Sequence, residues 1–232
     1  MNRSIPTMLA AAAVARVACT DVVRSWYNRW GAIDAEVARP MPLDEAIPHP
    51  RLVSTRAITI NATPEQIWPW LVQMGEPPRA GYYSYTWIER LAGLRVVNED
   101  EILPQFQELQ VGDVLDKNGT MTVRGVEPGS WLVLGPPASF EEVKATWAFA
   151  LYPIDERSTR LVTRVRSDWS YRSMLRSVPI VTLPLYLLIE PGAFIMERKM
   201  LHEIKRLAER LAARETDPSV VIRPFTRLAQ PA

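Results

Sequence analysis

One acidic residue interrupts the apolar stripe of the last predicted helix. At about 100° per residue, Glu197 falls on the same helical face as Met200 and Ile204. A carboxylate on such a face needs a partner, because burying an unpaired charge is unfavourable. It could act as a general acid or base in an apolar pocket, where loss of water raises the pKa of a carboxyl group. The favoured interpretation is a structural ion pair or a stripe-edge position that reaches solvent.

Cations for this carboxylate are expected on the last predicted strand. Arg164 and Arg166 alternate there with apolar residues, and either could pair with Glu197. Glu197 and Arg164 are the catalytic candidates, with Arg164 polarising a substrate carbonyl. Together with Asp168, the two arginines form one strand face, which could bind an anionic head group. Such a row is more often a solvated outer face with weak ion pairs.

Aromatic and methionine side chains supply candidate walls for a ligand pocket. The aromatic run at 82–87 could line a pocket mouth and donate phenol hydrogen bonds, or could be ordinary core and surface. An aromatic pair shares one strand face, and two methionines lie on the last helix, where methionine is most often plain core. The predicted ligand-binding residues are Tyr83, Tyr85, Trp87, Trp147, Phe149, Met196, Glu197 and Met200.

Composition argues against several other kinds of site. The single cysteine, Cys19, excludes an internal disulfide, a cysteine-based zinc site and a dithiol redox pair. The two histidines, His49 and His202, lie far apart, so a histidine metal site is not expected. The formal net charge is +1 and no dense basic block is present, so nucleic acid is not an expected partner. Without a phosphate-binding loop or a nucleophile–base set, no cofactor and no metal are predicted.

A strand followed by a short helix opens the main pattern. Residues 56–61 alternate isoleucine with other residues, as a half-buried strand does. Thr63 and Gln66 then have capping-box spacing, with proline at the first helical position. An amphipathic helix follows, and Gly75 is expected to end it as a left-handed C-cap.

Further helices and strands complete an α+β pattern. Thr86 and Glu89 have capping-box spacing ahead of a second short helix, and an apolar stripe from Ala193 to Leu211 predicts a long last helix. Between them, short turns separate the predicted strands Thr120–Val126, Ser130–Leu134, Lys144–Tyr152 and Arg160–Trp169. This order predicts a helix-grip fold: a curved antiparallel sheet wraps around a long C-terminal helix, with two short helices after the first strand and an N-terminal helical arm. A cavity often separates the helix from the sheet.

Two apolar runs lie outside this pattern. Met8–Ala15 resembles part of a targeting segment, but Arg16 interrupts it, so an N-terminal helix, Thr7–Trp30, packing on the domain or on a membrane surface is favoured. Four prolines between 40 and 50 predict an extended arm after it. Val178–Ile189 is too short to span a bilayer, which takes about 20 residues, and is interpreted as a buried connector or an interfacial patch.

The chain resembles the SRPBCC superfamily of START-like, birch-pollen-allergen and polyketide cyclase/dehydrase-like proteins. The resemblance rests on ITINATPEQIW (58–68) and FIMERKML (194–201). Between them, RAGYYSYTWIERLAG (79–93) and LQVGD (109–113) are similar to an uncharacterised bacterial branch. The resemblance implies the helix-grip fold over residues 52–214. It implies no catalytic residues, because this fold serves carriers, receptors, cyclases, hydroxylase domains and regulatory modules.

Three functions are compatible with these patterns. The leading hypothesis is a carrier or sensor that binds a small hydrophobic or amphipathic ligand, of lipid, polyketide or aromatic type, between sheet and last helix without turnover. The second is a cyclase- or dehydratase-like enzyme acting on a polyketide or aromatic substrate, with Glu197 or a tyrosine as proton donor. The third is an interaction module that contacts a membrane or a partner through its apolar stretches.

The expected organisation has three parts. Residues 1–51 form the helical and proline-rich arm, 52–214 the helix-grip domain and 215–232 a C-terminal tail. The expected location is the cytoplasm, and peripheral membrane contact through the N-terminal helix is the alternative left open. The expected partner is a small hydrophobic ligand, and no oligomeric state is predicted.

Overall fold

The computed structural model describes residues 20–91, 93–94, 96–137, 145–168 and 183–216 of the chain. The run Met8–Ala15, Cys19 and the tail beyond 216 lie outside these ranges, as do residues 178–182 of the second apolar run. Predictions for those segments stay predictions. Within the described part, no helix is long and apolar enough to cross a membrane.

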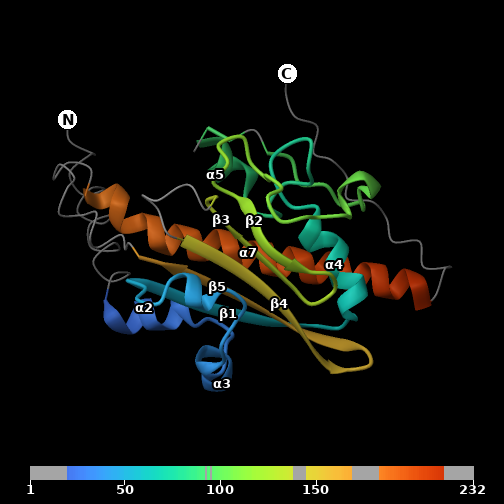
Figure 1. The fold of residues 1–232 in the computed structure, drawn as a ribbon, viewed down its shortest axis with the longest axis horizontal. Coiled ribbons are helices and arrows are strands. Elements are labelled where there is room, and N and C mark those ends of the chain that lie inside the picture. Colours follow the sequence, from blue (N-terminus) through green and yellow to red (C-terminus); the bar gives the residue numbers. More distant parts are fainter. Residues whose placement is uncertain (1–19, 92, 95, 138–144, 169–182, 217–232) are drawn as a thin grey trace, which may run out of the picture.

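In the described part of the chain, five antiparallel strands form one sheet in the order β1-β5-β4-β3-β2. The strands are β1 (Leu52–Ile60), β2 (Thr122–Glu127), β3 (Trp131–Gly135), β4 (Ala145–Asp155) and β5 (Ser158–Ser167). The last four make the predicted meander, and the first strand pairs with the last. Figure 1 shows the curved sheet with the long helix α7 (Leu183–Thr216) lying along it. The predicted α+β helix-grip fold is therefore confirmed.

The main core lies between the inner face of the sheet and α7. Strand residues alternate as predicted, so Ile58, Leu161 and Phe149 face the helix, where Ile204 and Leu207 pack against the same core. The opposite strand positions form a second, smaller cluster that includes Ala148 and Val162 on the outer face. Burial of both faces explains why β4 carries apolar residues at inner positions such as Phe149 and at outer positions such as Ala148.

Short helices close one side of this core. After β1, α4 (Pro64–Val72) begins with the predicted capping box: the backbone N–H of Thr63 donates to Gln66 Oε1 at 2.9 Å. The prediction for Gly75 is wrong. The helix ends at Val72, and Gly75 pairs with Gly81 in an isolated antiparallel bridge. A Cβ on Gly75 would lie 2.6 Å from the carbonyl oxygen of Leu115, so close backbone approach explains this glycine.

Two further short elements follow α4 and complete this side. They are α5 (Thr86–Leu91) and the 3-10 helix η2 (Pro104–Phe106). The capping box predicted for α5 is absent, because both carboxylate oxygens of Glu89 lack a hydrogen-bond partner in the described part of the chain. The helix also buries its acidic residue and exposes two of its apolar ones. Glu89 is buried, whereas Trp87 and Leu91 are 60% and 81% exposed.

The N-terminal arm packs in two parts: its first helix contacts β1 and α7, and the segment after that helix covers the outer face of the sheet. It contains α2 (Asp21–Asn28), α3 (Asp34–Ala38) and the 3-10 helix η1 (Asp44–Ala46). Arg160 of β5 pairs with Glu36 at 2.7 Å, and Arg164 pairs with Asp44 at 2.6 Å. Arg164 also donates to backbone carbonyls at the C-terminal end of α3, the end that favours a cation. The predicted solvated outer face is therefore wrong for this row, because the arm buries it.

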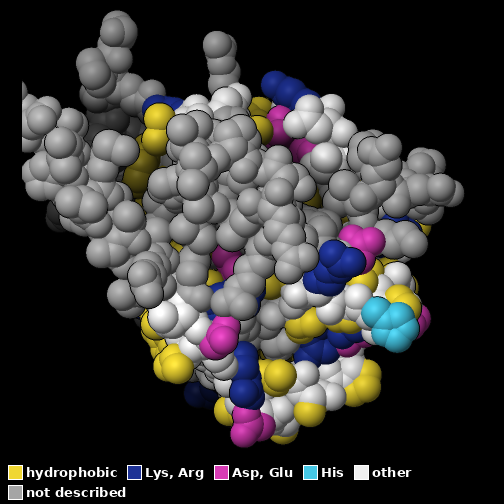
Figure 2. All heavy atoms as spheres, turned by 90° about the vertical axis from the view of Figure 1, so that its left-hand side faces the viewer, with side chains coloured by type: hydrophobic (Ala, Val, Ile, Leu, Met, Phe, Trp, Pro, Cys, Tyr) yellow, Lys and Arg dark blue, Asp and Glu magenta, His cyan; other side chains and the backbone are white. Residues whose placement is uncertain are grey.

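Charges on the exposed surface are mixed. On the face shown in Figure 2, the described Lys and Arg side chains are interspersed with acidic and hydrophobic ones. Opposite charges so arranged give no extended field of one sign on the part of this face that is described.

Candidate functional site

A cavity of about 490 Å³ lies between the inner face of the sheet and α7. Strands β1, β4 and β5 form its floor, and α7 forms its roof. Its side wall comes from residues of the 76–94 segment and from the loop at 116–121 that precedes β2. Small-molecule sites commonly have volumes of about 300–1,000 Å³, so the cavity is large enough for a ligand.

Half of the predicted ligand-binding residues reach this cavity. Trp147 lies on its floor, and Met196, Glu197 and Met200 lie on its roof. Phe149 is fully buried behind Trp147, with the two ring centroids 4.8 Å apart. The strand face was therefore predicted correctly, but one of its aromatics is wall and the other is core. That these residues contact a ligand stays a prediction.

The three residues of the aromatic run that were predicted to bind a ligand do not line the cavity. Tyr83 is buried in the main core, where Gln73 Nε2 donates to its hydroxyl at 2.8 Å. Tyr85 and Trp87 are exposed and do not line the cavity. The neighbour Tyr82, which the predicted set omitted, does line it.

A buried ion pair holds Glu197. Arg56 on β1 and Thr163 on β5 lie opposite each other in the sheet, and both reach this carboxylate. The guanidinium of Arg56 pairs with one oxygen, and the hydroxyl of Thr163 donates to the other at 2.5 Å. Arg56 is 3% exposed and Glu197 is 8% exposed. The favoured interpretation of Glu197 as a structural ion pair is confirmed, with a partner other than the two arginines expected.

The ion pair continues into a network that reaches α2. Arg56 donates to the backbone carbonyl of Tyr27 at 2.8 Å and to the side chain of Asn28 at 3.3 Å. Asn28 in turn donates to Glu190 at 2.8 Å, and Glu190 pairs with Arg24 at 2.9 Å. Burial lowers the pKa of Arg24, but the Glu190 carboxylate outweighs this and leaves it raised. At this end of the cavity, both carboxylates of α7 are therefore matched by cations.

Arg164 takes no part in the cavity. Its side chain lies on the outer face of β5, where the arm uses its donors, so it cannot pair with Glu197 on the inner face. The expected pairing of Glu197 with Arg164 or Arg166 is wrong. Strand alternation is the physical reason. Thr163 and Val165 point inward, whereas Arg164 and Arg166 point outward.

The opposite end of the cavity is acidic and less well satisfied. Glu76, Glu89 and Asp116 line it together with Tyr82. Burial raises the pKa of the Tyr82 phenol, and the three carboxylates add to the rise, while Arg79 opposes it. Burial also raises the pKa of Glu89. Among the described residues, no group of three or more His, Cys, Asp or Glu is arranged to hold a metal ion.

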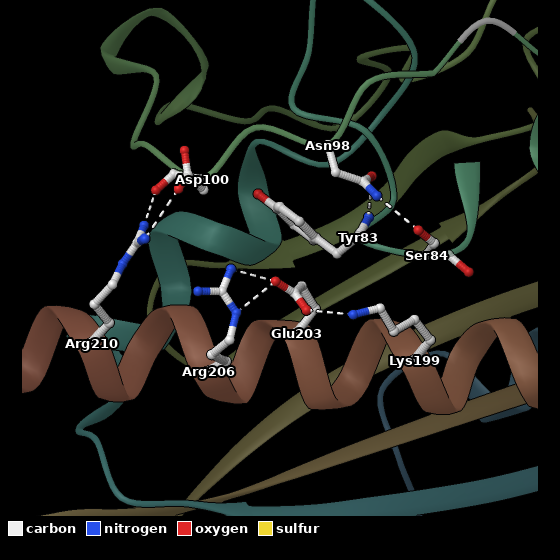
Figure 3. A network of polar contacts seen from close by, with 8 residues as sticks. All are labelled: Tyr83, Ser84, Asn98, Asp100, Lys199, Glu203, Arg206 and Arg210. Atoms are coloured by element: carbon white, nitrogen blue, oxygen red, sulfur yellow. Dashed lines mark hydrogen bonds and ion pairs between the residues drawn. The ribbon is translucent and has the colours of Figure 1, made fainter. Parts of the chain in front are cut away.

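A loop over α7 fixes the chain next to the cavity. In Figure 3, the Asn98 side chain accepts from the backbone N–H of Tyr83 and donates to the carbonyl of Ser84, and Asp100 points toward Arg210 of α7. Ser84 lines the cavity and donates to the backbone carbonyl of Met196 at 3.0 Å. The side wall is thus tied to the roof at Met196.

Comparisons with known proteins give only distant likenesses. No family model and no curated protein matches the chain. A polyketide-cyclase-like protein from Corynebacterium glutamicum is 10% identical, with 74% of this chain and 97% of that chain covered and a TM-score of 0.40. A protein from Mesorhizobium loti is 16% identical, with 68% and 98% covered and a TM-score of 0.36. The di-domain ARO/CYC StfQ from the steffimycin biosynthetic pathway is 11% identical, with 69% and 51% covered and a TM-score of 0.37.

Because the TM-scores lie below 0.5, the fold assignment rests on the strand order and on α7 packing against the sheet. The likenesses carry no statement about what this chain binds.

Sequence reasoning missed five charged residues of the cavity: Arg56, Glu76, Glu89, Asp116 and Glu190. Extending the alternation of Ile58 and Ile60 back by two residues places Arg56 on the inner face, so a signal for it was present. The spacing of Glu89 from Thr86 instead indicated a capping box, which gave no reason to place Glu89 in the cavity.

Proposed function

We propose that this chain binds a small hydrophobic or amphipathic molecule in the cavity between the sheet and α7, as a carrier or a sensor. The observation that carries the proposal is the cavity itself: about 490 Å³ is left unfilled at the place where the fold would otherwise have its core. Protein interiors are normally close-packed, so a space of this size points to an occupant. Its apolar walls, which include Leu52, Val165 and Met200, suit a hydrophobic body.

The structure does not support the predicted enzyme mechanism in which Glu197 donates a proton and Arg164 polarises a substrate carbonyl. Glu197 is held by Arg56 and Thr163, and Arg164 lies on the other face of the sheet. A proton donor and a carbonyl-polarising cation are therefore not brought together from this pair. The proposal remains binding without turnover.

The test uses the neutral fluorescent probe N-phenyl-1-naphthylamine, which brightens in apolar sites. The wild-type protein should bind it saturably, and Val165→Phe should weaken binding by about tenfold or more, because the larger side chain fills space on the cavity floor. The matched control is Val53→Phe, which places the same ring at a 40% exposed position on the outer face of β1.

Native mass spectrometry of the purified protein should in addition find an apolar molecule that is absent from Val165→Phe. Equal probe affinity in Val165→Phe and Val53→Phe, or no saturable binding at all, would refute the proposal.

A further inference from the structure

The buried carboxyl group of Glu89 stands out among the described residues of the cavity. Glu89 on α5 is 1% exposed and lines the cavity, and neither of its oxygens has a hydrogen-bond partner within the described residues. The short helix presents this residue inward while Trp87 and Leu91 face solvent. A helix packed only for stability would bury its apolar side chains and expose its carboxylate. The orientation of α5 therefore costs stability and calls for another explanation.

Two other buried carboxylates around the cavity, Glu197 and Glu190, do have partners. Glu197 has Arg56 and Thr163, and Glu190 has Arg24 and Asn28. Buried polar groups in native proteins nearly always have partners, and the exceptions concentrate at functional sites. The open hydrogen-bonding capacity of Glu89 thus lies in the wall of the space left for a ligand.

The charges that share this end of the cavity with Glu89 determine what kind of group would be attracted there. Glu76 is 8% exposed and lines the same end of the cavity, as does Asp116. All three carboxylates lie close enough to Tyr82 to raise the pKa of its phenol. Among the described residues, Arg79 is the cation that opposes this rise.

Arg79 does not neutralise these carboxylates by direct contact. Its guanidinium donates to the backbone carbonyls of Val72 and Met74 and stacks over the ring of Phe106, 4.7 Å from the centroid. Within the described residues, it forms no ion pair at 4.0 Å or less with Glu76, Glu89 or Asp116. Three carboxylates then face one arginine that is engaged elsewhere, so the potential at this end favours a positive ligand group.

We infer that the cavity selects a hydrophobic molecule that carries a basic amine, with Glu89 as the counter-ion of that amine. This inference rests on the proposed function and names the ligand class. An ammonium group would supply a positive counter-charge and hydrogen-bond donors, and Glu89 has neither among the described residues. Such charge-assisted hydrogen bonds are stronger than bonds between neutral groups. The apolar body of the ligand would lie against Trp147, Val165 and Met196. An anionic head group would be repelled from the same end.

The test compares three probes that share one chain: dodecylamine, dodecanol and dodecanoate, each kept below its aggregation concentration. Each competes with N-phenyl-1-naphthylamine on the wild-type protein at neutral pH. Dodecylamine should displace the naphthylamine at the lowest concentration and dodecanoate at the highest. In Glu89→Gln, dodecylamine should weaken by a factor on the order of ten to one hundred, as expected for loss of one bond to a charged partner, while dodecanol stays within about twofold.

The control variant is Glu127→Gln, which removes a carboxylate from the exposed end of β2 and should leave all three probes unchanged. A second readout is proton release. Because burial holds the pKa of Glu89 high, binding of an ammonium ion should expel a proton from the part of the population that is protonated. Calorimetry in buffers of different ionisation enthalpy measures this proton, and it should vanish in Glu89→Gln.

The outcomes distinguish failure of the inference from failure of the proposed function. If N-phenyl-1-naphthylamine and dodecanol bind but dodecylamine has no advantage over dodecanol, the inference is overturned and the proposed function stands. The same holds if Glu89→Gln keeps the full preference for the amine. If no probe binds, the proposed function fails and the inference fails with it. The wild-type probe series decides the matter even if Glu89→Gln does not fold.

Discussion

Replacing Glu89 with glutamine should alter how the stability of the protein depends on pH. Burial raises the pKa of Glu89, and its two oxygens have no partner within the described residues. In the unfolded chain the same carboxyl group titrates near its ordinary value of about 4.3. Below that pH both states carry the proton, and the contribution of Glu89 to stability is fully present. As the pH rises, the unfolded chain loses the proton first, so the free energy of unfolding falls until the pH passes the folded pKa.

The magnitude follows from the linkage between proton binding and folding. Between the two pKa values, the free energy of unfolding of the wild-type protein should fall relative to the variant by about 1.4 kcal/mol per pH unit. Glutamine has nearly the same shape and does not titrate. At low pH a protonated carboxyl and an amide are both neutral and both buried, so the two proteins should differ by no more than about 1 kcal/mol.

The measurement is urea unfolding of ligand-free wild-type protein and of Glu89→Gln at steps between about pH 4 and pH 8. The difference in the free energy of unfolding should rise with pH in favour of the variant and then level off. Dividing its total rise by the same slope of about 1.4 kcal/mol per unit gives the pKa shift directly. Glu127→Gln, at an exposed position, should track the wild-type protein throughout. A flat difference, or one that falls as pH rises, would show that Glu89 is solvated or paired and would refute the reasoning.

Three further predictions concern groups that hold the structure together. Arg56→Met should lower the free energy of unfolding by about 3–5 kcal/mol in urea, because it leaves Glu197 buried without its cation; an effect below about 1 kcal/mol would contradict a buried pair. Arg164→Met should free the arm, so that limited proteolysis cuts within residues 31–47 faster than in the wild-type protein; an unchanged cleavage rate would show that Arg164 does not hold the arm on the sheet. Gly31→Ala should lower the thermal midpoint, since Gly31 has φ of +73° and a Cβ there would lie 2.1 Å from a backbone oxygen of β1; an unchanged midpoint in calorimetry would show that the chain can move aside.

Local patterns were enough to predict most of the fold. The alternation in β1, β4 and β5, the capping box at Thr63 and the stripe on α7 each depend on neighbours in sequence, and each appears in the structure. The inner and outer faces of β4 and β5 follow from the same alternation. For this reason Trp147 could be placed on the helix-facing side of the sheet, and the stripe placed Met196 and Met200 on the sheet-facing side of α7, before their surroundings were known.

The rest depends on contacts between distant parts of the chain. The cation that pairs with Glu197 is 141 residues away, and an equally suitable arginine at 164 lies on the wrong face of its strand. The arm that buries Arg164 begins more than one hundred residues earlier, so composition suggested a solvated face. Glu89 was misread for a different reason: capping-box spacing is a preference of isolated helices, and tertiary packing overrode it.

The anchoring of α7 limits where a ligand can enter. Glu190 and Glu197 lie two turns apart on this helix and are held by α2, β1 and β5. Further along, Lys205 donates to the carbonyl oxygen of Thr59 at 2.8 Å, and Arg210 pairs with Asp100 at 3.1 Å. Sliding or lifting α7 would break all of these contacts together. The segment around α5 is held to α7 by the hydrogen bond from Ser84 to the carbonyl of Met196. Displacing α5 breaks this bond and leaves the anchors of α7 in place, so a bound molecule should exchange by displacement of α5. The exchange rate should therefore respond to changes at Ser84 far more than to changes on the outer side of α7.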